Sequence, residues 1–220
     1  MSAKRIYVII AFICCLTTAM GQTKVSINAI PQFNEAFGIR VGADIELPLK
    51  SRWSFLPGVY WSMRNRSSTS SFEGWDFESA DFDKTYDYTD RAHFLTIPLR
   101  MSVLVAGKRD TNFNMKIYFG PYIAYGMTGT SKCDINNDGI ISTTRVGAFD
   151  STGRYKDRWD FGNNLGVEFL LKKHLKLGLM CEFGLRKIYK EDDIVGDIIG
   201  EIFLVNKINL AFGIGVGYQF

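Results

Sequence analysis

Large apolar residues alternate with small or polar residues along the last thirteen positions of the chain. Every even position from Ile208 to Phe220 is large and apolar or aromatic, and the odd positions are Asn209, Ala211, Gly213, Gly215, Gly217 and Gln219. Successive side chains of a strand point to opposite faces. Period two therefore predicts a β-strand here, with one apolar face and one small or polar face.

The same alternation recurs seven more times along the chain. Four segments are strongly patterned, namely 37–47, 115–127, 159–171 and 175–186, and three are weaker, namely Lys24–Pro31, Trp53–Arg66 and His93–Val105. Several of these eight predicted strands are longer than the five or six residues usual in soluble sheets, and long enough to cross a membrane at a tilt. Proline cannot donate to a central ladder, so bulges or ladder breaks are expected at some of Pro31, Pro57, Pro98 and Pro121.

The predicted connections alternate between tight turns and long polar segments. Lys50–Arg52, Gly107–Asn112 and Lys172–His174 are tight, whereas Ser67–Arg91, Ser131–Asp157 and Lys190–Asn206 are long. Outer-membrane barrels have short periplasmic turns and longer external loops. The pattern therefore predicts that both termini are periplasmic.

The small and charged face decides between a soluble barrel and a membrane barrel. An eight-stranded barrel encloses a space just wide enough for side chains to fill, so the large apolar faces of eight long strands would not fit inside it. These faces are expected to contact lipid, with aromatic residues near the strand ends forming interfacial girdles. The predicted fold is an all-β, eight-stranded, antiparallel, transmembrane up-and-down barrel. The charged residues expected inside it are Arg40, Asp44, Glu46, Arg64, Arg100, Lys116, Asp160, Glu168, Lys176, Glu182 and Arg186.

The first 21 residues have the pattern of a secretory signal peptide. Lys4 and Arg5 precede an apolar run from Ile6 to Leu16, and Ala19 and Gly21 are the small residues expected before a cleavage site. Residues 1–21 are thus predicted to be a signal peptide and residues 22–220 the barrel domain of a Gram-negative outer-membrane protein. An uncleaved anchor helix and a lipoprotein cut before Cys14 or Cys15 are the alternatives. The apolar run is shorter than the ~20 residues that span a bilayer.

Composition limits the possible partners and covalent chemistry. The formal net charge of +3 gives no field that argues for nucleic acid binding. Two of the four cysteines lie in the predicted signal peptide, so the mature chain keeps only Cys133 and Cys181 and has no disulfide framework. Cys181 is expected to face lipid and Cys133 to lie in a long loop.

The chain resembles the PorT-like outer-membrane β-barrel family of Bacteroidota, which is similar in architecture to the small OmpA and OmpX barrels. The matching stretches are "SFLPGVYWS", "HFLTIPLRMSVL", "IYFGPYIAYGMTG", "WDFGNNLGVEFLL" and "INLAFGIGVGYQF". The Gly-Pro-Tyr at 120–122 and the Asp-Phe-Gly at 160–162 are the most specific of these. The resemblance implies the fold, an outer-membrane location and recognition of the C-terminal strand ending at Phe220 by barrel-assembly machinery. It implies no catalytic residues.

The sequence from Asp134 to Ile141 fits the first half of a calcium-binding loop. Asp134, Asn136 and Asp138 supply oxygen ligands at alternate positions, and Gly139 supplies the turn. The second half does not fit, because Arg145 occupies the position of the bidentate glutamate. Weak calcium binding and a plain polar turn are the two interpretations, and no other cofactor is expected.

Only His93 and His174 are available for acid–base catalysis, and neither has a carboxylate or serine placed convincingly beside it. The preferred function is a non-enzymatic barrel with a structural role, or one that presents its loops to an external or periplasmic protein. A narrow channel or an accessory to protein export is the second possibility, and a barrel hydrolase or acyltransferase is the third. Outer-membrane lipid is the expected surrounding in every case.

Overall fold

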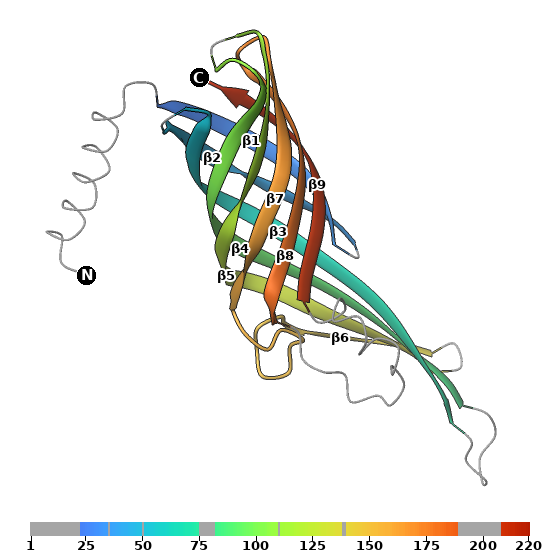
Figure 1. Ribbon diagram of the computed structural model, residues 1–220. Coiled ribbons are helices and arrows are strands. Elements are labelled where there is room, and N and C mark those ends of the chain that lie inside the picture. Colours follow the sequence, from blue (N-terminus) through green and yellow to red (C-terminus); the bar gives the residue numbers. More distant parts are fainter. Residues whose placement is uncertain are drawn as a thin grey trace, which may run out of the picture.

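The computed structural model describes residues 23–34, 36–49, 51–74, 82–109, 111–137, 140–188 and 208–220. The predicted signal peptide, residues 1–21, lies outside the described residues and stays a prediction. Nine antiparallel strands account for most of the described chain (Figure 1). They are β1 (Lys24–Asn34), β2 (Ala36–Pro48), β3 (Trp53–Gly74), β4 (Phe82–Gly107), β5 (Phe113–Asn137), β6 (Ile140–Gly147), β7 (Trp159–Leu171), β8 (Leu175–Lys187) and β9 (Ile208–Gln219).

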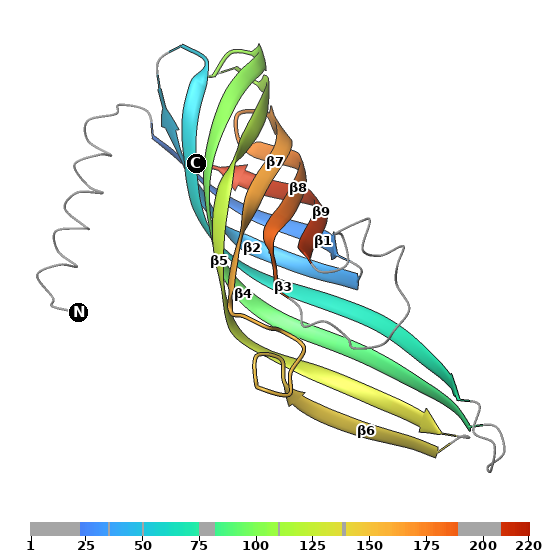
Figure 2. The same cartoon turned by 60° about the horizontal axis from the view of Figure 1, so that its bottom comes forward.

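Eight of these strands form a closed barrel in which each strand pairs with its neighbours along the chain. The order is β1-β2-β3-β4-β5-β7-β8-β9, and pairing of β1 with β9 closes the ring. The ninth strand, β6, pairs only with the outer part of β5 and lies outside the ring (Figures 1 and 2). The predicted eight-stranded up-and-down barrel is therefore confirmed.

The pattern of exposure identifies the outside of the barrel as the apolar face. Phe212, Ile214 and Val216 are 51–60% exposed, and Leu165 and Leu179 are 48% and 55% exposed on the neighbouring strands β7 and β8. Charged residues at the alternate positions are buried instead. Large apolar side chains in such a continuous outward band require a hydrocarbon surrounding. Among the described residues there is no helix long and apolar enough to cross a membrane.

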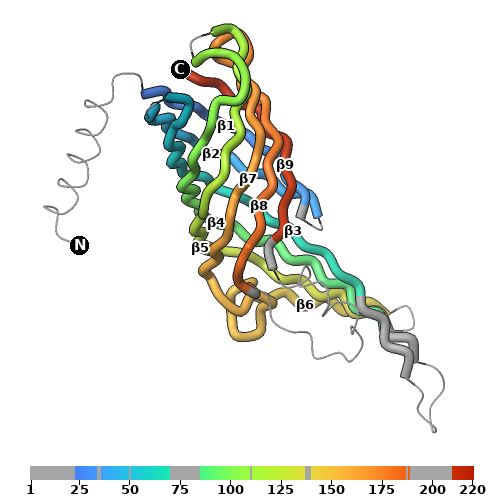
Figure 3. Tube along the Cα trace, viewed as in Figure 1, coloured from blue at the N-terminus to red at the C-terminus, as the bar shows by residue number. Residues whose placement is uncertain are grey.

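The three tight turns occur where the alternation predicts them. They join β2 to β3, β4 to β5 and β7 to β8, and they gather at one end of the barrel, where β1 also begins and β9 ends (Figures 1 and 3). Their backbone enters the left-handed region at Ser51 (φ 63°), Gly107 (φ 81°), Lys172 (φ 50°) and Lys173 (φ 67°). Left-handed residues reverse the chain within a few positions, which keeps these connections short.

The predicted long loops at 67–91 and 131–157 are wrong over most of their length. β3 and β4 stay paired from Arg66 opposite Asp90 to Gly74 opposite Phe82, and β5 pairs with β6 from Thr130 opposite Gly147 to Asn137 opposite Ile140. We call this four-stranded extension of the barrel wall, residues 66–74, 82–90, 131–137 and 140–147, the projecting sheet (Figure 2). The sequence resembles a loop because neither face of these strands contacts lipid, so neither face carries a continuous row of large apolar residues.

The projecting sheet also changes the position expected for one cysteine. Cys133 lies in β5 opposite Tyr88 of β4 and Thr144 of β6, and not in a loop. Cys181 lies opposite Leu165 and Phe212 on the lipid-facing side of the barrel, as predicted. Both are free thiols. The third predicted loop, Lys190–Asn206, lies outside the described residues.

The predicted ladder breaks occur beside all four prolines. Pairing of β1 with β9 passes from Ala29 directly to Gln32, which skips Pro31. Pairing of β2 with β3 skips Pro57, and pairing of β3 with β4 skips Pro98. Pairing of β4 with β5 passes from Pro98 opposite Tyr122 to Met101 opposite Phe119, which skips Pro121. The missing amide donor of proline explains each gap.

Leu165→Arg places a charge in the middle of the lipid-facing surface and should destabilise the barrel by about 2–4 kcal/mol. Urea unfolding in lipid vesicles, followed by tryptophan fluorescence, measures this change. Ile141→Arg is the matched control because Ile141 is 68% exposed on the projecting sheet, outside the membrane. Equal effects of the two substitutions would contradict the assignment of the apolar face to lipid.

Candidate functional site

Five cationic and five acidic side chains are buried together inside the barrel. They are Arg40, Arg64, Arg100, Lys116 and Lys176, with Asp44, Glu46, Asp160, Glu168 and Glu182, and each is at most 8% exposed. Their formal charges cancel. All ten were predicted to point inward from the alternation in their strands, and we call them the lumen network.

Glu182 is the centre of the half of the network nearer the end opposite the tight turns, which we call the outer end of the barrel. Arg40 donates to its carboxylate, and Arg64 reaches the same carboxylate at 2.8 Å while also donating to Asp160 at 2.7 Å. Asn164 adds a donor 3.3 Å from Glu182. Four strands, β2, β3, β7 and β8, are thereby connected across the interior.

The half nearer the turns is organised around Asp44. Its carboxylate accepts from Arg100, from the Tyr60 hydroxyl at 2.6 Å and from Asn28 at 2.9 Å. Two further pairs complete this half: Lys116 with Glu46 at 2.5 Å and Lys176 with Glu168 at 2.7 Å. A cavity lined by Asp44, Arg100 and the Lys176–Glu168 pair, among others, has a volume of about 30 Å³. That is room for a water molecule or two.

Aromatic rings and glycines complete the packing of the interior. The Arg40 guanidinium lies 4.4 Å from the centroid of the Tyr60 ring, and that of Arg100 lies 4.8 Å from the Tyr118 ring. A Cβ atom at Gly166 would collide with the Tyr118 hydroxyl. The inward glycine thus provides the space that its large neighbour fills, which explains why small and charged residues share one face.

The segment between β6 and β7, residues 148–158, lies at the outer end of the barrel, and we call it the plug (Figure 2). Phe149 and Tyr155 of the plug pack on Phe94 of β4, with ring centroids 5.7 and 5.8 Å apart. Arg64 of the lumen network lies 4.3 Å from the same Phe94 ring. The plug therefore contacts the lumen network through Phe94. No periodic signal in the sequence marks this segment, because it has no repeating face.

Hydrogen bonds attach the plug to the barrel wall on several sides. Gly126 of β5 donates to the Arg158 carbonyl at 2.6 Å, and Lys156 donates from its backbone to the Ile188 carbonyl at 2.8 Å. Arg154 donates to Ser68 at 2.8 Å and lies over the Tyr88 ring at the base of the projecting sheet. The plug is thus held by β3, β4, β5 and the end of β8.

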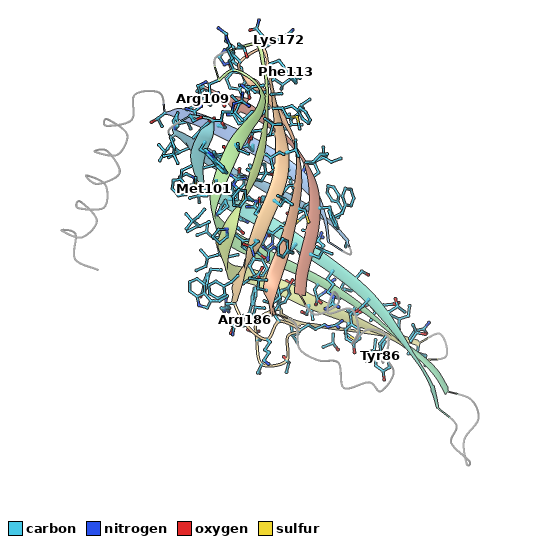
Figure 4. All side chains as sticks on the ribbon, in the orientation of Figure 1. Tyr86, Met101, Arg109, Phe113, Lys172 and Arg186 are labelled. Atoms are coloured by element: carbon cyan, nitrogen blue, oxygen red, sulfur yellow. The ribbon has the colours of Figure 1, made fainter. Side chains whose placement is uncertain are left out.

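Arg186 is the one charged residue whose predicted inward position is wrong. Its side chain is 44% exposed at the outer end of β8 and donates to Asp157 of the plug at 2.6 Å (Figure 4). The pairing of β8 with β9 becomes irregular after Phe183, so the alternation no longer places side chains in the lumen there. The backbone amide of Trp159 and the Arg186 guanidinium both lower the pKa of Asp157 below its ordinary value.

A known protein-family model, the outer membrane protein beta-barrel domain, matches residues 16–190. The chain belongs to this family. Comparison with curated proteins gives no match.

Solved barrels similar to this family member have low sequence identity to it. A major outer membrane protein from Thermus thermophilus is 17% identical with a TM-score of 0.44, over 90% of this chain and 100% of that one. The N-terminal barrel domain of Pseudomonas aeruginosa OprF is 15% identical with a TM-score of 0.40, over 90% and 100%. Neisserial surface protein A is 10% identical with a TM-score of 0.40, over 90% and 95%.

Two of the three residues predicted to bind calcium, Asp134 and Asn136, lie on the projecting sheet of this outer-membrane barrel. Asp134 accepts hydrogen bonds from Lys132 at 2.5 Å and Thr143 at 2.6 Å, and the Lys132 contact lowers the pKa of its carboxyl group. Asn136 follows two residues later on the same strand, and Asp138 lies outside the described residues. Within the described part of the chain, no three His, Cys, Asp or Glu side chains are grouped to hold a metal. Calcium binding stays a prediction, and the ion would compete with Lys132 for Asp134.

Neither histidine faces the lumen network. His93 faces outward from β4 and stacks on Trp61, with ring centroids 5.4 Å apart. His174 lies in the β7–β8 turn, where Nδ1 is 2.8 Å from the Gln219 carbonyl oxygen and the ring stacks on Tyr218. Both therefore take part in packing at the two ends of the barrel.

Glu182→Gln should destabilise the barrel by about 3–5 kcal/mol, because it leaves Arg40 and Arg64 buried beside a neutral group. Urea unfolding in vesicles gives the free energy of unfolding. Arg186→Gln, which breaks the exposed pair with Asp157, is the control and should cost less than about 1 kcal/mol. A Glu182→Gln barrel as stable as the parent would show that the lumen network does not hold the interior together.

Proposed function

We propose that this outer-membrane barrel neither conducts solutes nor catalyses a reaction, and that it supports the projecting sheet for contact with another protein. The filled interior is the observation that carries the proposal. The lumen network pairs ten charges across the barrel, and at its outer end the plug packs Phe149 and the buried Tyr155 on Phe94. A solute would have to separate buried ion pairs to pass, which is costly.

The form of the projecting sheet supports a role in binding. One face, continuous with the barrel interior, carries Tyr86 and Tyr88, whose rings stack 6.4 Å apart, and Ile135 beside them on β5. The opposite face carries Thr69, Asp87 and Thr143 among other polar residues. An ordered surface with aromatic groups on one side is well suited to bind a partner because little conformational entropy is lost.

The lack of an assembled catalytic set supports the non-enzymatic part of the proposal. Within the described residues, the buried carboxylates of the lumen network are all engaged by Arg, Lys, Tyr, Ser or Asn donors, and both histidines point away from them. These charges are used for packing the interior. The third function considered from the sequence, a hydrolase or acyltransferase, is therefore not proposed.

The finer grouping with the PorT-like barrels, and with it the accessory role in protein export, is a second proposal. It is favoured by a contact between the two most specific matching motifs. Tyr122 of Gly-Pro-Tyr donates to Asp160 of Asp-Phe-Gly at 2.9 Å, and a Cβ atom at Gly162 would meet the Tyr122 ring. The two motifs thus form one structural unit between β5 and β7.

The proposed orientation has both termini and the tight turns in the periplasm and the projecting sheet outside the cell. The C-terminal strand supports this arrangement: Phe220 donates from its backbone to Val25 at 2.9 Å, and its ring is 67% exposed beside Tyr218. An exposed aromatic end on a paired edge of the barrel is suited to recognition by the barrel-assembly machinery.

The purified barrel should give negligible conductance in planar bilayers, because the lumen network and the plug fill the pathway. A general porin reconstituted in the same bilayers is the positive control. Discrete, reproducible conductance steps from the folded barrel would overturn the non-conducting assignment and favour the channel alternative.

Cysteine labelling of intact cells tests the orientation. In a Cys133→Ser/Cys181→Ser background, Ser142→Cys on the projecting sheet should react with a membrane-impermeant maleimide. Lys108→Cys in the β4–β5 turn should react only after the outer membrane is permeabilised. Both parent residues are exposed, so accessibility within the protein is matched. The reverse labelling pattern would mean that the sheet is periplasmic.

A further inference from the structure

Every connection at the turn end of the barrel carries exposed or half-exposed cationic residues. Arg52 lies in the β2–β3 turn, Lys108 and Arg109 in the β4–β5 turn, and Lys172 and Lys173 in the β7–β8 turn. Lys24 adds a sixth charge where β1 begins. We call these six residues the basic collar; Figure 4 shows Arg109 and Lys172 together at this end, beside the outward Phe113. In the sequences of the three turns, 49–52, 107–112 and 172–174, Asp110 is the only acidic residue.

Most of the positive charge of the collar has no acidic partner in the described protein. For Arg52, Lys108, Lys172 and Lys173, no carboxylate among the described residues lies within ion-pair distance. Arg109 donates to the backbone carbonyls of Leu49 and Trp53 at 3.4 and 2.5 Å, and Lys24 donates to the Arg109 carbonyl at 3.2 Å. The lumen network is the opposite case, because its five positive charges face five negative ones.

The collar lies at the depth where lipid headgroups begin. Trp53, Phe113 and Tyr218 face outward next to the turns, with 41–48% of each side chain exposed, and Trp53 packs edge-on against Phe119. Outward aromatic residues of membrane barrels lie at the interface between hydrocarbon and water. Cationic side chains just beyond such residues reach the lipid phosphates.

The distribution of the collar around the barrel indicates which anion it meets. The β2–β3, β4–β5 and β7–β8 turns and the start of β1 follow one another around the closed ring. A lipid leaflet contacts the barrel on all sides, whereas a docked protein contacts one side. We propose that the basic collar binds the phosphate groups of anionic phospholipids in the leaflet at the turn end of the barrel.

Trp53 provides a local reporter for this interaction. The chain has four tryptophans, and Trp61→Phe/Trp75→Phe/Trp159→Phe leaves only Trp53, next to Arg52 and bonded through its carbonyl to Arg109. Quenching of its fluorescence by brominated phosphatidylglycerol, relative to brominated phosphatidylcholine, gives the relative affinity of the two lipids. Each cationic side chain near an anionic surface contributes roughly fivefold to affinity at low salt. We expect at least about a fivefold preference for phosphatidylglycerol at low salt, decreasing at high salt as charges are screened.

Arg52→Gln/Lys108→Gln in this background should remove most of the preference. Arg145→Gln/Lys156→Gln is the matched control, because it removes two exposed cationic residues at the far end of the molecule and should leave the preference unchanged. Lys172→Asn/Lys173→Asn is a second test variant; asparagine tolerates the left-handed backbone of that turn, so folding is preserved.

Equal quenching by the two lipids in the parent would overturn the proposal, as would a preference that survives in both collar variants. Folding is checked for every variant by the heat-dependent shift in gel mobility. The collar and the projecting sheet lie at opposite ends of the barrel, so the lipid proposal and the proposed function can fail separately.

Discussion

Compensation of buried charge inside a narrow barrel is the constraint on which the rest of the structure depends. Eight strands enclose too little space for bulk water, so each charge taken inside must find its partner among the other strands. Glu182 on β8 meets this requirement for both Arg40 on β2 and Arg64 on β3, and Asp44 meets it for Arg100 on β4. The inward glycines follow from the same constraint, because a long arginine or a tyrosine fits only where its neighbour has no side chain.

Because the interior is filled and its charges cancel, the two ends of the barrel are the parts that we propose to contact other molecules. At the outer end, the wall continues as the projecting sheet, and the plug connects its base to the lumen network through Arg154 on Tyr88 and Tyr155 on Phe94. At the other end, the short turns carry cationic side chains that have few carboxylates near them in the described protein. The barrel thus carries the projecting sheet at one end and the basic collar at the other, with the lumen network between them.

The sequence allowed prediction of the barrel strands, their two faces and the ten charges of the lumen network. Alternate residues of each strand contact lipid on one side and the polar lumen on the other, so they must be apolar and polar in turn. Leu165 must be apolar where it contacts lipid, and Asn164 must be polar where it contacts Glu182. Arg186 was wrongly assigned to the lumen because it lies an even number of residues after the inward Glu182. The pairing of β8 with β9 is irregular between Phe183 and Lys187, so the alternation no longer sets the side-chain direction there. The plug could not be predicted, because Phe149 and Tyr155 act through a contact with Phe94 more than fifty residues earlier in the chain.

The projecting sheet shows why the sequence is least informative about the part of the molecule that we propose to be functional. Beyond the membrane both faces of β3, β4 and β5 meet an aqueous surrounding, so the alternation disappears and Ser67–Ser71 reads as a solvated loop. What continues is the backbone ladder, which is set by the strands already paired in the barrel: once β3 and β4 are in register at Met63 and His93, extending the pairing from Arg66 to Ser71 requires only that no residue break it. The strand pairing of the projecting sheet thus continues the register of the membrane-spanning strands, and it does not depend on which side chains the sheet carries. A surface that is rigid in its backbone and unconstrained in its side chains is a favourable place for a binding specificity to evolve.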